Sequence, residues 1–169
     1  MSTLASAYKD SVLKRFISYK ELGEKTFDQL SEMDFQYSPN EASNSIAQII
    51  QHMHGNMLSR WTNFLTEDGE KSWRERDEEF ESHKYDRATL LKLWKEGWDC
   101  MFKALEMLDA DDLIKTVYIR QQPLTVVDAI NRQLAHYPYH VGQIVFIAKI
   151  LRNQDWKSLT IPKKPAVKH

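Results

Sequence analysis

The sequence predicts an all-α protein, a four-helix bundle with long crossover connections. Its apolar residues recur mainly at spacings of three and four, which is typical of amphipathic helices, and only five glycines and five prolines interrupt them. With 169 residues, 42% of them hydrophobic and 28% charged, the chain can bury one core. We therefore expect a single domain over residues 1–155, followed by a C-terminal tail over residues 156–169.

The first two helices are predicted from their apolar stripes and from the break between them. The first begins at Leu4 and is expected to end before the Ser-Pro-Asn break at residues 38–40. The second follows Asn44 or Ser45, either of which can accept a hydrogen bond from an N-terminal amide. Its apolar stripe predicts a helix that runs to about residue 65.

A polar connection separates the second helix from the third. Residues 66–86 are charged and contain an Asp-Gly turn, so we expect a long ordered loop that Trp73 and Phe80 anchor to the body. Asp86 is expected to cap the third helix, whose broad apolar face extends to Leu108.

The last third of the chain contains a β-prone piece and the fourth helix. Residues 116–119 (TVYI) favour an extended conformation, and the fourth helix is expected from about residue 125 to residue 152. The single cysteine, Cys100, falls away from the apolar face of the third helix. We therefore do not expect Cys100 to act as a nucleophile. No residue stands out as a general base.

Charge and cysteine content exclude several classes of protein. The net charge of -1 offers no field that would attract nucleic acid or an anionic membrane. One cysteine cannot form an internal disulfide, and the N-terminal segment lacks the apolar region of a signal peptide. No apolar run approaches the roughly 20 residues that a membrane span requires. A cytoplasmic protein with a small-molecule substrate is the resulting expectation.

Two histidines on the fourth helix form a candidate metal pair. His136 and His140 are four residues apart, so their side chains lie on one face of a helix about one turn apart. Both imidazoles can then reach one ion. A third ligand must come from another helix.

His52 and His54 compete for the role of third ligand on the second helix. Helical periodicity slightly favours His54, because His52 lies beyond the edge of the apolar stripe. However, His52, Asn56 and Arg60 are spaced by four and form a polar stripe. Such a stripe fits either the wall of a polar cavity or a solvated helix face, and the spacing leaves both ligands open.

Three segments resemble the DinB-like superfamily, also called the DinB/YfiT group, in a bacterial branch of about this length whose function is undetermined. The segments are SIAQIIQHMHGNMLSRW, DGEKSWRERDEEFE and NRQLAHYPYHVGQIVFIAK. The resemblance spans nearly the whole chain and implies a four-helix-bundle metalloenzyme fold. It implies that His52, His136 and His140 hold a divalent ion, usually nickel or zinc, with His54 as the runner-up.

Three neutral imidazoles leave at least one coordination position open, which is typical of catalytic rather than structural sites. The resemblance favours a metal-dependent S-transferase that uses a low-molecular-weight thiol such as bacillithiol on small electrophiles, and it implies a homodimer. Two alternatives stay open: a hydrolase that uses metal-bound hydroxide, and a non-catalytic metal-binding or interaction protein.

Four residues are candidates for binding the cofactor. The guanidinium groups of Arg60 and Arg132 could bind a carboxylate of the thiol. Asn56 and Gln143 could line the cavity or orient the ligands, since Gln143 is three residues after His140 on the same side of the helix.

Overall fold

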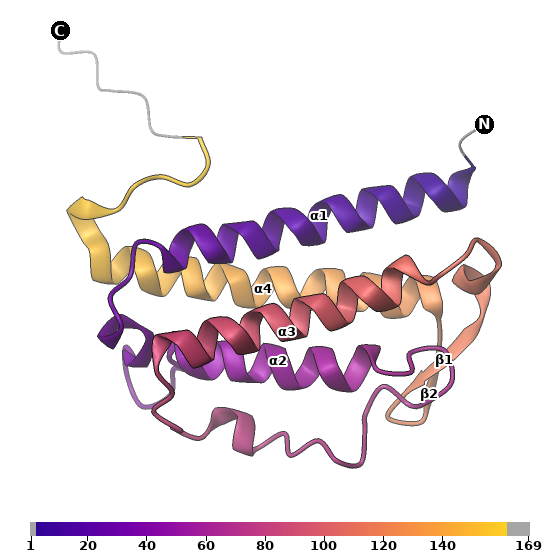
Figure 1. Cartoon of the computed structure of the whole chain (residues 1–169), viewed down its shortest axis with the longest axis horizontal. Helices are drawn as coiled ribbons and strands as arrows, with labels where there is room; N and C mark the ends of the chain where they lie inside the picture. The colour runs from indigo at the N-terminus through magenta and orange to yellow at the C-terminus, as the bar shows by residue number, and fades with distance from the viewer. Residues whose placement is uncertain (1–2, 162–169) are drawn as a thin grey trace, which may run out of the picture.

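The computed structural model describes residues 3–161 and confirms the predicted four-helix bundle (Figure 1). The long helices are α1 (Leu4–Phe27), α2 (Ile46–Trp61), α3 (Arg87–Glu106) and α4 (Val126–Arg152). Three short 3-10 helices lie in the connections: η1 (Met33–Gln36), η2 (Glu78–Phe80) and η3 (Asp111–Ile114). A fourth, η4 (Asn153–Asp155), follows α4. Helix α2 packs mainly against α3, and α1 packs mainly against α4.

Each of the four long helices begins after a residue whose side chain caps its N-terminus. Ser45, rather than Asn44, caps α2: its hydroxyl accepts from the Gln48 amide (3.2 Å), and the Gln48 side chain accepts from the Ser45 amide (2.8 Å). Helix α2 ends at Trp61, earlier than predicted. The reason is local, because the next residues leave the helical conformation, and Asn63 adopts a left-handed one (φ 49°).

The β-prone piece forms one strand of a two-stranded hairpin, whose second strand was not predicted from the sequence. Strand β1 (Thr116–Ile119) pairs antiparallel with β2 (Gln122–Thr125), a strand that contains Pro123 and leads directly into α4. The backbone amides of Arg120 and Gln121, at the turn, donate to the Asp68 carboxylate (2.9 and 2.7 Å). The hairpin is thereby attached to the loop between α2 and α3.

The α2–α3 loop packs along α2 (Figure 1) and is anchored by Phe80, as predicted, but not by Trp73. The Phe80 ring stacks on the His52 imidazole with 4.8 Å between ring centroids. The Trp73 side chain is 53% exposed, so that prediction was wrong. In this segment Arg74, whose side chain is 2% exposed, turns inward to form ion pairs.

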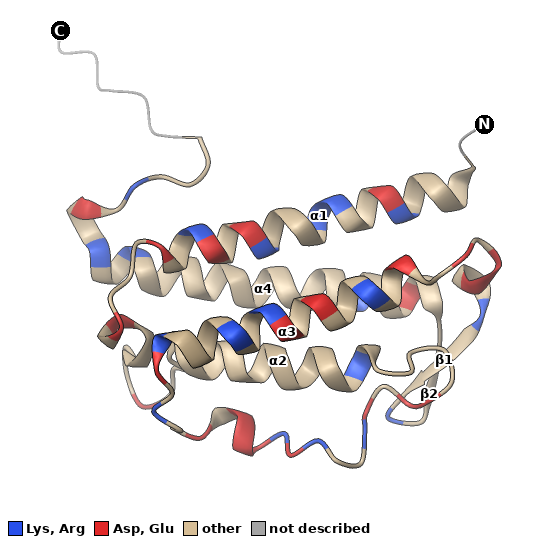
Figure 2. Cartoon of the chain, in the orientation of Figure 1, with Lys and Arg blue, Asp and Glu red and all other residues tan. Residues whose placement is uncertain are grey.

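Charged residues are distributed unevenly over the four helices. Figure 2 shows both signs of charge along α1, α3 and the α2–α3 loop, with few on α2 and α4. Three tryptophans, Trp61, Trp94 and Trp98, lie in the core. Within residues 3–161 no helix is long and apolar enough to cross a membrane.

Candidate metal centre

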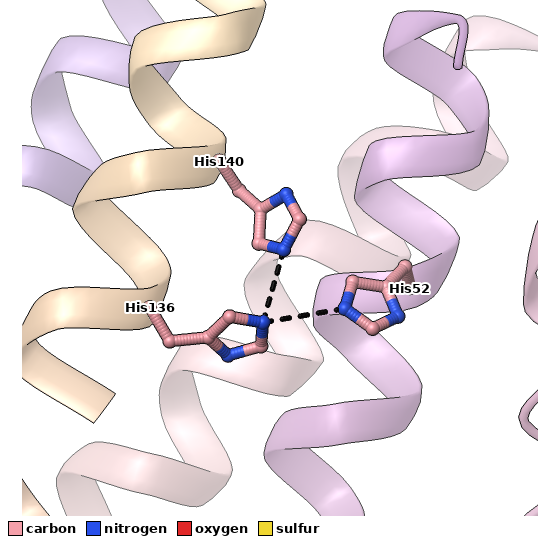
Figure 3. Close-up of side chains that lie close together, drawn as sticks. All are labelled: His52, His136 and His140. Atoms are coloured by element: carbon pink, nitrogen blue, oxygen red, sulfur yellow. Dashed lines mark hydrogen bonds between the residues drawn. The ribbon is translucent and has the colours of Figure 1, made fainter. Parts of the chain in front are cut away.

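Three histidines from two helices converge on one point between α2 and α4 (Figure 3). The Nε2 atom of His136 lies 3.0 Å from Nε2 of His140 and 3.4 Å from Nε2 of His52. One ligand atom from each of the three lies within 4.8 Å of the others. His54 is not part of this cluster, because its Nε2 atom lies 3.5 Å from the Glu96 carboxylate of α3.

Each of the three imidazoles is oriented by an oxygen at its other ring nitrogen. These oxygens are Glu79 Oε2 (2.9 Å from His52 Nδ1), Gln133 Oε1 (3.3 Å from His136 Nδ1) and Gln143 Oε1 (3.0 Å from His140 Nδ1). A carboxylate or amide oxygen accepts a hydrogen bond, so each Nδ1 carries the proton. The Nε2 lone pairs are then unprotonated and directed at one another, an arrangement that a cation between them would stabilise.

Burial keeps two of these imidazoles neutral. Burial, together with the positive charge that neighbouring histidines would carry if protonated, lowers the pKa of His136 to about 3 and that of His140 to about 4. At neutral pH both rings are therefore free bases. Three imidazole nitrogens within reach of one point could hold a metal ion.

The partner of His52 is held in place from two sides. Arg74 donates to Glu79 through two parallel hydrogen bonds, Nε to Oε1 (2.7 Å) and Nη2 to Oε2 (2.8 Å). Burial alone would raise the pKa of the Glu79 carboxyl, but the hydrogen bonds from His52 and Arg74 hold that pKa below its usual range. On the other side, the carboxylate lies against Gly55, which has no side chain to block it.

A cleft of about 390 Å³ opens over the histidine cluster. Residues from α2, the α2–α3 loop, the hairpin turn and α4 line it. Five of the lining residues are arginines: Arg60, Arg74, Arg76, Arg120 and Arg132. Among the described residues that line the cleft there is no aspartate or glutamate, so the wall is strongly cationic.

A family model described as "Protein of unknown function (DUF1572)" matches residues 3–165. The chain belongs to the DUF1572 family. The match includes both helices that carry the histidines. No curated protein matches the chain.

All four predicted cofactor-binding residues line the cleft of this DUF1572 protein, but some of them already form hydrogen bonds within the protein. Arg132 is exposed, whereas the buried Arg60 guanidinium donates to the Gly69 carbonyl and to Glu70 (3.0 Å). The Asn56 carbonyl accepts from Tyr137 (3.1 Å). These contacts make Arg132 the freer of the two arginines.

Several residues of the DUF1572 site were not anticipated from the sequence. Gln133 precedes His136 by three residues, as Gln143 follows His140 by three, and this symmetric spacing could have indicated it. Glu79 had no such signal, because it lies in the run RERDEEFE, where acidic residues follow one another without periodicity. Only the packing of the loop on α2 singles it out.

Cys100 does not belong to the histidine cleft of the DUF1572 protein. Its thiol is half-buried on α3, 3.8 Å from the Thr62 hydroxyl, and lines a separate hollow near the end of α2. Burial raises the pKa of the Cys100 thiol, which disfavours the nucleophilic thiolate.

Proposed function

We propose that this protein is a divalent-metal-dependent S-transferase that joins a low-molecular-weight thiol, of the bacillithiol type, to small electrophiles. The observation that carries the proposal is the convergence of three unprotonated Nε2 atoms at the base of an open cleft. The resemblance of the histidine-bearing segments to the DinB-like superfamily supports thiol transfer as the reaction.

His52, His136 and His140 would hold the ion, for which we propose nickel or zinc. Three protein ligands leave a coordination position open to a small molecule. When bound there, the ion would act as a Lewis acid that lowers the pKa of a thiol and keeps it as the thiolate at neutral pH.

The other residues of the site would orient the ligands and position the substrates. Gln133, Gln143 and Glu79 fix the three imidazole planes through their Nδ1 protons. For the cofactor itself we retain Asn56, Arg60, Arg132 and Gln143 as the proposed binding residues, all of which line the cleft.

The proposed reaction balances without a redox partner. The thiolate sulfur forms a bond to the electrophilic carbon, the bond from that carbon to its leaving group breaks, and the leaving group departs with the electron pair. The thiol proton is released to solvent through the open cleft. Holding the thiolate and the electrophile side by side would supply much of the rate acceleration.

The first experiment compares metal content, by elemental analysis, in the wild type and in His52→Ala, His136→Ala and His54→Ala. We expect about one ion per chain, lost in the first two variants and retained in His54→Ala. The wild type is then assayed with bacillithiol and a chromogenic electrophile, and separately with ester and amide substrates without thiol. Thiol-independent hydrolysis would favour a hydrolase, and the absence of tightly bound metal would refute the proposal.

From the same resemblance we also propose that the protein forms a homodimer. Multi-angle light scattering coupled to gel filtration tests this directly. A mass of one chain across the accessible concentration range would refute it.

A further inference from the structure

We infer that the mouth of the cleft contains an anion-binding subsite, formed by Arg76 and Arg132, for a carboxylate or phosphate group of the molecule that reaches the histidines. This inference names the substrate class of the proposed site and rests on the proposed function for its thiol. The evidence for it is the difference in ion pairing among the five arginines of the cleft.

The positive charge of the cleft is local. The whole chain has a net charge of -1, yet five arginines and no carboxylate line this one cleft. A divalent ion on the three histidines would add two further positive charges. Such a concentration of cations in a small volume is costly unless it is neutralised, so a ligand of opposite charge is favoured.

Three of the five arginines are already paired with two carboxylates behind the wall, Glu70 and Glu79. Glu70 accepts hydrogen bonds from Arg60 (3.0 Å), Arg120 (3.0 Å) and Arg74 (3.3 Å). Arg74 is also paired with Glu79. These arginines therefore form a structural network, and their donors are largely used.

Arg132 is the first of the two arginines that remain available. It lies on α4, four residues before His136, so its side chain is one turn from the cluster on the same face. It is exposed, lines the cleft, and forms no ion pair with any residue of 3–161. Its guanidinium can therefore bind an anion without breaking an existing contact.

Arg76 approaches the cleft from the α2–α3 loop. Its guanidinium lies over the Phe80 ring, 5.5 Å from the centroid, and that ring stacks on His52. Its one ion-pair partner among the described residues is Asp77 (3.6 Å), whose side chain is fully exposed. A pair in that position is weak, since water solvates both charges, so a ligand can replace Asp77 at small cost.

The two arginines line the same cleft as the three histidines but come from different segments, Arg132 from α4 and Arg76 from the α2–α3 loop. A small molecule that places its sulfur at the histidines and carries one or two oxyanion groups would meet both guanidinium groups. Carboxylates and phosphates both suit the planar fork of arginine. A neutral thiol would gain nothing from them.

The test compares two small thiols, the anionic mercaptosuccinate and the neutral 1-thioglycerol, on the full chain loaded with Co²⁺, where sulfur binding produces a charge-transfer absorption. We expect mercaptosuccinate to bind at least tenfold more tightly, with the advantage shrinking as salt is added. Arg132→Gln and Arg76→Gln should each reduce that advantage about three- to tenfold. Arg15→Gln, an exposed arginine on α1 away from the cleft, is the matched control.

Equal binding of the two thiols, or an advantage that both cleft variants retain, would overturn the subsite. If neither thiol binds the cobalt protein, the proposed function fails, and the subsite is judged alone by calorimetric titration with succinate and with inorganic phosphate. Binding of either anion that Arg132→Gln weakens supports the subsite and identifies the preferred oxyanion. No binding of either anion overturns it.

Discussion

The carboxylate of Glu79 occupies the space beside Gly55 that a side chain would fill: a β-carbon added at Gly55 would lie 2.1 Å from Glu79 Oε1. Gly55 lies on α2, and Glu79 lies in the α2–α3 loop, so the contact joins two separate segments of the chain. It allows the α2–α3 loop to approach α2 closely enough for Glu79 to reach His52 Nδ1. The proposed metal site therefore depends on an absent side chain.

Replacing Gly55 with alanine should weaken metal binding. The added β-carbon meets the end of the Glu79 side chain, so Glu79 must move away from His52 and from its buried partner Arg74. The loss of the Arg74 pair lowers the free energy of unfolding, and the helix preference of alanine, up to about 1 kcal/mol, offsets part of that loss. We expect a loss of about ten- to a hundredfold in metal affinity, because His52 loses its orienting carboxylate. Competition with a chromophoric chelator measures the affinity.

The matched control is Gly142→Ala on α4, where an added β-carbon would have no neighbour within 4 Å. This variant should gain a few tenths to about 1 kcal/mol of stability and retain its metal affinity. If Gly55→Ala binds metal as tightly as Gly142→Ala, Glu79 has no part in holding the site.

Glu79→Gln tests the charge of the residue rather than its position. The amide can still accept from His52 Nδ1, but it loses the two-pronged ion pair with Arg74 and the negative charge near the ion. We expect about a tenfold loss of metal affinity in the same chelator assay. Glu78→Gln changes the exposed acidic neighbour and should leave the affinity unaltered; equal losses in both variants would point to a general field effect.

The metal-free protein should lose stability in mild acid. The pKa values of buried His136 and His140 are lowered to about 3 and about 4, against 6.5 in an unfolded chain. Between these values the unfolded state binds more protons, so the free energy of unfolding falls as the pH drops below about 6.5. Urea denaturation at several pH values from 7 to 5 measures the decline.

His136→Gln should flatten this pH dependence, whereas His83→Gln, which removes an exposed loop histidine, should not. A metal-free wild type that is as stable at pH 5 as at pH 7 would contradict the assignment of two buried neutral imidazoles.

Tyr137→Phe should destabilise the core. The Tyr137 hydroxyl accepts from Trp61 Nε1 (3.0 Å) and donates to Asn56 Oδ1 (3.1 Å), and all three residues are buried. Removing it leaves a buried donor and a buried acceptor without partners, which costs about 1–3 kcal/mol. Chemical denaturation should show this loss, while Tyr139→Phe, at a tyrosine that is 63% exposed, should be nearly neutral.

The features of the fold that could be predicted from the sequence are those that depend on local interactions. Helix positions follow from apolar periodicity and from caps such as Ser45 and Asp86, which act within one turn. The neighbourhood of His136 and His140 follows equally from their spacing of four on one helix. Each of these features depends on residues that are close in the chain, so the order of the amino acids determines them.

Only the tertiary structure decided which groups from different segments meet. Periodicity favoured His54, but packing turns His54 toward α3 and His52 toward α4. Arg60 is paired because the α2–α3 loop brings Glu70 back to α2. Glu79 reaches His52 across 27 residues because Gly55 leaves room for it. Helix rotation and loop packing minimise the free energy of the whole chain, so no local pattern encodes these contacts.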